Sequence, residues 1–167
     1  MKKRLFKTIL YYVFPFLWAL LFVCGAFIPE RLFQNFHQAL PLTLIVIFYY
    51  AVFSPQRLNV VLVFILGLLA DLLSFSTLGL NAFIFVGMFF MANLLQAYIY
   101  SFSFKHLWFV FCSLMLLCDI VWAWLARLST GVWVSASFWL VQYIFMCLCY
   151  PVIIWITGKL NHYIKEA

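Results

Sequence analysis

Long apolar runs limit most strongly what this chain can fold into. The stretch "NVVLVFILGLLA", residues 59–70, has no polar side chain after its first residue. It belongs to one of several runs that approach the roughly 20 residues a helix needs to cross a bilayer. The runs are apolar on every face, whereas the strands of a membrane β-barrel alternate apolar and polar residues. The pattern therefore predicts an all-α membrane protein.

Composition supports this class and excludes others. Of the 167 residues, 69% are hydrophobic and only 8% are charged, and a small soluble domain cannot bury that much apolar surface. The net charge of +6 comes from basic residues at the ends of the apolar runs, so no nucleic-acid partner is expected. Function must reside in the helices, the short loops, or surfaces offered to other proteins.

Polar connections divide the runs into six expected membrane-spanning helices within a single integral membrane domain, residues 1–167. Because the second and third are short, neighbours must shield them or the bilayer must thin around them. Three prolines inside the runs, at positions 15, 41 and 151, free backbone carbonyls that other helices must satisfy. The expected helices cover approximately residues 8–28, 39–53, 58–73, 81–100, 106–126 and 138–158.

The basic residues predict the orientation of the helices. With both termini cytoplasmic, most Lys and Arg residues lie on the inner side, as the positive-inside rule requires. The first basic cluster also places positive charge against anionic lipid. The opening resembles a signal peptide as well, but its long apolar stretch favours an uncleaved helix over cleavage after Ala26. The residues that set this topology are Lys2, Lys3, Arg4, Lys7 and Arg57.

Two carboxylates, Asp71 and Asp119, fall inside the expected spans. Each costs about 2.5–3.5 kcal/mol near the bilayer centre and therefore needs a partner or a proton. Gly67 and Ser74 share a helical face with Asp71, which predicts close packing between helices. A proton relay or a ligand site is the alternative, but a relay needs further ionisable groups, and the inner halves of the spans contain none.

The segment after Asp71, "SFSTLGLNA", predicts a helix break that leaves no backbone group unsatisfied. Gly79 permits a turn with positive φ, and Asn81 can cap the following helix. The hydroxyls of residues 74, 76 and 77 can bond freed carbonyls. We therefore expect a structural or partner-interaction role for six residues: Gly67, Asp71, Ser74, Gly79, Asn81 and Asp119.

Catalytic, metal and cofactor sites are not predicted. The five cysteines lie in apolar runs without a CxxC or Cys/His spacing, and the three histidines share no metal-ligand spacing. No nucleophile, base and acid lie at comparable depth. We therefore expect neither an enzyme nor a cofactor.

Residues 42–83, "LTLIVIFYYAVFSPQRLNVVLVFILGLLADLLSFSTLGLNAF", resemble the bacterial rod shape-determining protein MreD family. That family has the pattern G-x-x-x-D-x-x-x-x-x-x-L-G near mid-chain, here Gly67, Asp71, Leu78 and Gly79. A later Asp of the family corresponds to Asp119 in "LCDIVW". The chain departs from the family at Thr77, where proline is common.

The resemblance implies a non-catalytic scaffold of the cell-elongation machinery in the bacterial inner membrane. It implies docking to MreC, and through it to MreB, RodA and a class B penicillin-binding protein. It also implies a six-helix fold similar to the substrate-binding components of energy-coupling-factor transporters. The alternative function is therefore a small-molecule-binding subunit of such a transporter.

Overall fold

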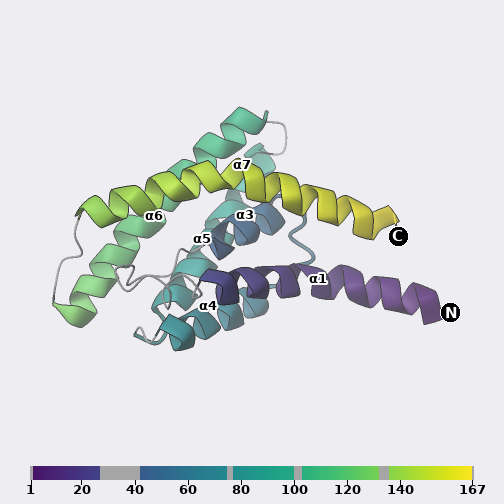
Figure 1. Cartoon of the computed structure of the whole chain (residues 1–167), viewed down its shortest axis with the longest axis horizontal. Coiled ribbons are helices and arrows are strands. Elements are labelled where there is room, and N and C mark those ends of the chain that lie inside the picture. The colour runs from purple at the N-terminus through teal and green to yellow at the C-terminus, as the bar shows by residue number, and fades with distance from the viewer. Residues whose placement is uncertain (1, 27–41, 75–76, 100–102, 132–135, 167) are drawn as a thin grey trace.

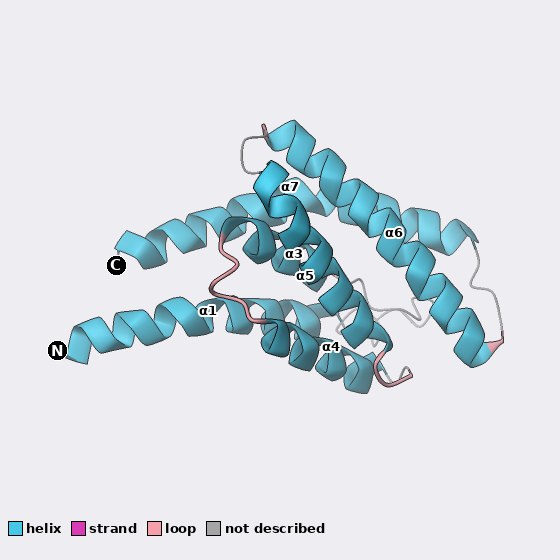
Figure 2. Cartoon of the chain, turned by 180° about the vertical axis from the view of Figure 1, so that it is seen from behind, coloured by secondary structure: helices cyan, strands magenta, loops and turns pink. Residues whose placement is uncertain are grey.

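The computed structural model describes residues 2–26, 42–74, 77–99, 103–131 and 136–166, and all its regular structure is helical. The six helices within these ranges confirm the predicted all-α class (Figure 1). Both chain ends lie at the same end of the molecule (Figures 1 and 2). The helices are α1 (Lys2–Ala26), α3 (Thr43–Phe53), α4 (Val60–Ser74), α5 (Leu80–Ile99), α6 (Phe104–Thr130) and α7 (Ala136–Glu166).

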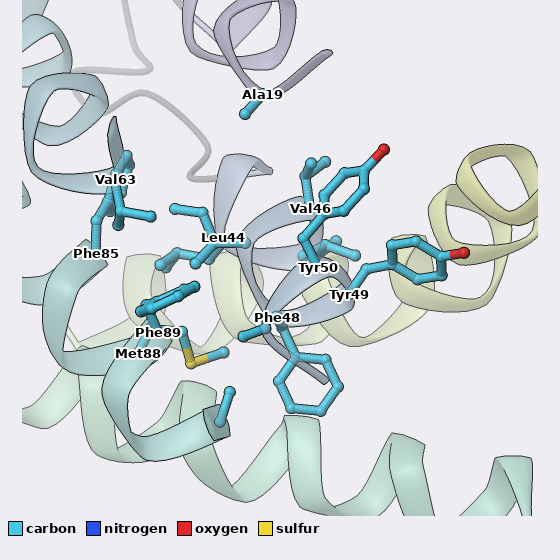
Figure 3. Packing of buried hydrophobic residues seen from close by; sticks show 14 of the residues in the cluster. Ala19, Leu44, Val46, Phe48, Tyr49, Tyr50, Val63, Phe85, Met88 and Phe89 are labelled. Carbon is cyan, nitrogen blue, oxygen red and sulfur yellow. The ribbon is translucent and has the colours of Figure 1, made fainter. Parts of the chain in front are cut away.

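The shortest helix, α3, lies at the centre of the bundle. Every residue from Thr43 to Val52 is buried, because α1, α5 and α7 all pack against α3. Figure 3 shows its side chains among those of α5, which include Phe85 and Met88. Eleven residues span only about 16 Å, far less than the roughly 30 Å hydrocarbon core. The expectation that neighbours shield this helix is confirmed.

Contacts between aromatic rings join α3 to the two longest helices. The ring of Phe111 on α6 lies with its centroid 4.4 Å from that of Tyr150 on α7 and 5.3 Å from that of Phe48 on α3. All three side chains are fully buried. Such pairs add about 0.5–1.5 kcal/mol each beyond the burial of their area. The interior between these helices is therefore filled with aromatic side chains.

Pro151 lies inside α7 and cannot donate the hydrogen bond that the carbonyl of Cys147, four residues earlier, would accept. The indole N–H of Trp108 on α6 donates to that carbonyl over 3.0 Å. The sequence predicts that another helix must satisfy a carbonyl freed by this proline, and the structure confirms it. Trp108 thereby fastens α6 to α7.

A second set of polar contacts joins α7 to α1, α3 and the loop before α4. The indole of Trp18 on α1 donates to the hydroxyl of Thr157 over 3.2 Å. The guanidinium of Arg57 donates to the amide oxygen of Asn161, and that amide donates to the Tyr49 hydroxyl over 3.4 Å. Arg57, expected only as an orienting charge, is 5% exposed and holds the α3–α4 loop against α7.

The outward surfaces of α6 and α7 are largely apolar. The stretches Phe104–Leu125 and Leu140–Tyr163 are long and apolar enough to cross a membrane. Shorter apolar helices occur at Val13–Gly25, Thr43–Phe53 and Val60–Ser74, and at Leu80–Gln96. These features agree with an all-α membrane protein.

Replacing Trp108 by Phe tests the bond to the carbonyl of Cys147. The variant keeps an aromatic ring but leaves the carbonyl without its donor, so we expect a loss of about 1 kcal/mol of stability. Thermal unfolding in detergent measures it. Trp124→Phe is the matched control, because Trp124 is exposed on the same helix. Equal unfolding temperatures for both variants would contradict the assignment.

Candidate functional site

Helices α4 and α5 form a tightly packed hairpin, visible as the neighbouring α4 and α5 ribbons in Figure 2. At Gly67 on α4 an added Cβ atom would lie 2.3 Å from the Cα atom of Ala82 on α5. No side chain can occupy that space, so the two backbones touch directly. Gly67 therefore permits an approach that any other residue would block.

Asp71 lies one turn after Gly67 and is fully buried. Its carboxylate accepts hydrogen bonds from the backbone N–H groups of Gly79 over 2.8 Å, Asn81 over 2.9 Å and Ala82 over 3.4 Å. These groups belong to the start of α5, where the first N–H groups of a helix have no partner within it. The positive end of the helix dipole also favours an anion there. Asp71 thus caps α5 from a neighbouring helix.

The turn between the two helices brings these N–H groups to the carboxylate. Gly79 has a φ of +96°, the left-handed conformation that glycine adopts without strain. The N–H of Leu80 then donates to the carbonyl of Thr77 over 3.3 Å, which closes the turn. Asn81 lies inside α5, not ahead of it. The expectation that its side chain caps the helix is therefore wrong, because Asp71 supplies the acceptor and Asn81 contributes a backbone donor.

Ser74 is the last residue of α4, and its side chain bonds back to the backbone of its own helix. Its hydroxyl donates to the carbonyl of Ala70 over 2.9 Å and approaches that of Asp71 at 3.3 Å. Both carbonyls belong to the last turns of α4, and such bonds from a serine hydroxyl to carbonyls three and four residues earlier are common in helices. Ser76, expected to act in the same way, lies outside the described residues.

The other predicted residues lie elsewhere. Asp119 is half-buried on α6, where its electrostatic neighbours include Cys118 and Tyr143. It is not among the residues that contact the Asp71 carboxylate in the described part of the chain. Four predicted topology residues lie in the first turns of α1, and nothing further is described of their side chains: Lys2, Lys3, Arg4 and Lys7.

Sequence reasoning missed two contributors to this architecture. Ala82 packs against Gly67, and its backbone N–H donates to the Asp71 carboxylate. The sequence signal for it is a small residue just after the turn, where α5 first passes α4. Asn161 binds Arg57 at a distance of more than a hundred residues in the chain, and no local pattern indicates that contact.

The chemistry of the Asp71 site is structural. Both carboxylate oxygens accept N–H donors, and the group lies out of reach of solvent. Among the described residues, no three His, Cys, Asp or Glu side chains converge to hold a metal ion. Around the hairpin, large apolar side chains point outward: Leu72, Leu73, Leu78 and Phe83. The arrangement fixes a rigid apolar surface.

Gly67→Ala tests the contact between the two backbones. The added methyl group collides with the backbone of Ala82, so α4 and α5 must separate and we expect a loss of about 1–3 kcal/mol. Gly87→Ala on α5 is the control, because a Cβ there meets nothing within 4 Å. Thermal unfolding in detergent measures both, and a Gly67→Ala variant as stable as the control would refute the close approach.

Replacing Asp71 tests the cap. Asp71→Leu leaves the first N–H groups of α5 without their acceptor in an apolar environment, and we expect a loss of about 2–4 kcal/mol. Asp71→Asn keeps one acceptor oxygen without the charge, so its loss should be intermediate. Hydrogen exchange of the amides of residues 79–82 measures the effect locally. Unchanged exchange in Asp71→Leu would rule out the cap.

Comparison with known proteins supplies the family. No curated protein sequence and no solved structure matches the chain. Residues 3–155, which include the α4–α5 hairpin and Asp119, match the sequence profile of the family described as rod shape-determining protein MreD. That stretch covers most of the 167 residues. The chain therefore belongs to the rod shape-determining protein MreD family.

Proposed function

We propose that this chain is a non-catalytic scaffold of the cell-elongation machinery in the bacterial inner membrane. Membership of the MreD family supports a role in determining rod shape. In the proposed arrangement the chain is a single multi-pass domain with six spans and both termini in the cytoplasm. The positions of the two chain ends at one end of the molecule support that topology (Figure 1).

The observation that carries the proposal is the engagement of the buried Asp71 carboxylate by three backbone N–H groups. A proton carrier or a substrate ligand must exchange its partners during function, whereas this carboxylate is committed to the start of α5. Its burial and its three partners therefore favour a structural role. By holding α4 and α5 together, Asp71 maintains the apolar surface of the hairpin, which other membrane helices can contact.

The partners in this proposal follow from the family resemblance. MreC is the direct partner, and MreB, RodA and a class B penicillin-binding protein are engaged through it. Contact with MreC would use the exposed side chains near the turn, such as Leu78 and Phe83. Membrane lipid surrounds the remaining apolar surface.

A transporter subunit that binds a small molecule is the competing function. The proposed fold similarity to the substrate-binding components of energy-coupling-factor transporters is its basis. Such a subunit needs a polar cavity, and the space between α3, α6 and α7 is filled by Phe48, Phe111 and Tyr150. The filled aromatic interior favours the scaffold.

Affinity purification with MreC in mild detergent tests the scaffold. We expect Gly79→Val to reduce co-purified MreC several-fold, because a β-branched residue cannot adopt the positive φ without strain. Gly87→Ala should retain MreC at the unsubstituted level. Both variants must first reach the membrane in equal amounts and elute as single species.

Retention of MreC by Gly79→Val at the unsubstituted level would count against docking through the hairpin. Failure of the unsubstituted chain to bring down MreC would count against the scaffold itself. A shift in the unfolding temperature of purified protein with a vitamin or a lipid-linked wall precursor would instead support the transporter subunit.

A further inference from the structure

The two longest helices contact one another over only part of their length. The described polar contacts between α6 and α7 lie near one crossing, where Trp108 reaches Cys147 and the Tyr143 hydroxyl donates to the carbonyl of Cys112 over 3.2 Å. Beyond this crossing, the end of α6 and the start of α7 diverge in the view of Figure 1. We call the diverging parts, residues 116–128 of α6 and 140–142 of α7, the α6–α7 wedge.

Burial confirms that the wedge is loosely covered. None of residues 140–145 of α7 is buried, and Leu140 is 61% exposed. Of the α6 residues 119–125, only Ala123 is buried. Leu116, Ile120 and Trp124 on α6 are exposed as well. The core therefore does not cover the face that bears Leu116, Ile120 and Trp124, although Trp122 and Leu125 pack against the core.

A carboxylate lies in this apolar region. Trp108, Cys112 and Met115 form the stripe of α6 that leads along the crossing with α7, and Asp119 is the next residue on it at helical spacing. Tyr143 of α7 is among the electrostatic neighbours of Asp119. Within the described ranges, no hydrogen bond or ion pair reaches the Asp119 carboxylate. The Asp71 carboxylate, by contrast, accepts hydrogen bonds at both of its oxygens.

A carboxylate in a membrane-spanning segment is stabilised by a cation or a hydrogen-bond donor. We propose that the α6–α7 wedge receives a single transmembrane helix of another protein, and that this helix donates a basic side chain to Asp119. The proposal rests on the scaffold function and names the surface that such a scaffold presents. Charge complementarity identifies the occupant, because lipid chains offer no donor at this position.

A second copy of the chain fits the wedge less well. Along α6, Asp119 lies about 21 Å from Lys105 and about 12 Å from Arg127, at 1.5 Å per residue. A second copy in the same orientation would therefore bring no basic group of α6 to the level of Asp119. A twofold interface would also place like carboxylates near each other. A second copy that packs through α6 therefore supplies no cation, which favours a different chain as the source of the basic residue.

Photo-crosslinking in native membranes tests the proposal. A photoreactive benzophenone amino acid replaces Leu116 or Leu140 in the wedge of the full chain. Phe64 on α4 and Phe90 on α5, both exposed and away from the turn between these helices, are the control positions. We expect the wedge positions to crosslink one membrane protein about tenfold more efficiently than the controls. The crosslinked peptide should be a membrane-spanning segment with Lys or Arg within one helical turn of the crosslink.

Asp119 variants then test the ion pair. Asp119→Leu should lower the wedge crosslink about tenfold, the change expected from losing one strong interhelical bond, while Asp119→Glu should preserve it. Exchanging the charges, with Asp119→Arg in this chain and Asp at the partner's basic position, should restore the crosslink. Equal membrane levels of all variants are required for the comparison.

Several results would overturn the proposal. These are equal crosslinking at wedge and control positions, crosslinks between two copies of this chain, a crosslinked segment without a basic residue, and full crosslinking in Asp119→Leu. If MreC still co-purifies while the wedge gives no crosslink, the wedge proposal fails and the scaffold stands. If MreC does not co-purify either, both fail.

Discussion

The hydrogen bonds from the start of α5 to the Asp71 carboxylate determine how the first half of the bundle is built. An acid in a membrane span and an uncapped helix start are each costly. Here each group removes the cost of the other, because the carboxylate accepts the N–H groups that α5 cannot bond internally. Neither helix end is stable in lipid without its neighbour, so α4 and α5 form one unit. Helices α1, α3 and α6 pack against that unit.

Two further features depend on this pairing. Gly67 can touch the backbone at Ala82 only when the turn holds α5 directly against α4. The hairpin also forms one wall around α3, which is much shorter than the roughly 30 Å hydrocarbon core and is buried through Val52. A central helix of eleven residues is tolerated because the neighbouring helices, rather than lipid, surround it. The position of α3 thus depends on its packing against α5 of the hairpin, together with α1 and α7.

The sequence predicts the class of the fold and much of the Asp71 turn, because both depend on local patterns. Apolar runs indicate six helices, Gly79 indicates a positive φ, and Pro151 indicates a freed carbonyl. The donor to that carbonyl is Trp108, and no spacing identifies it, because the contact depends on how two distant helices cross. For the same reason the sequence places Arg57 at a surface, whereas Asn161 holds it inside.

Helix ends illustrate the same limit. The expected last helix stops at Gly158, yet α7 continues to Glu166. A single glycine costs a helix only about 1 kcal/mol, and the contacts of Thr157 with Trp18 and of Asn161 with Arg57 on either side keep the helix in place. At the end of α6, by contrast, Gly131 adopts a φ of +73° and closes the helix through its N–H bond to the Arg127 carbonyl. Tertiary contacts decide which glycine ends a helix.

The two intramembrane carboxylates show how one residue type supports two roles. Asp71 and Asp119 give the same sequence signal, an acid within an apolar run, and they differ only in their structural environment. The Asp71 carboxylate accepts the N–H groups at the start of α5 and so stabilises the fold itself. Asp119 lies beyond the crossing of α6 and α7, where the described residues offer it no donor. In the proposed scaffold, Asp71 fixes the shape of the hairpin, and Asp119 would determine where a partner helix with a basic side chain binds.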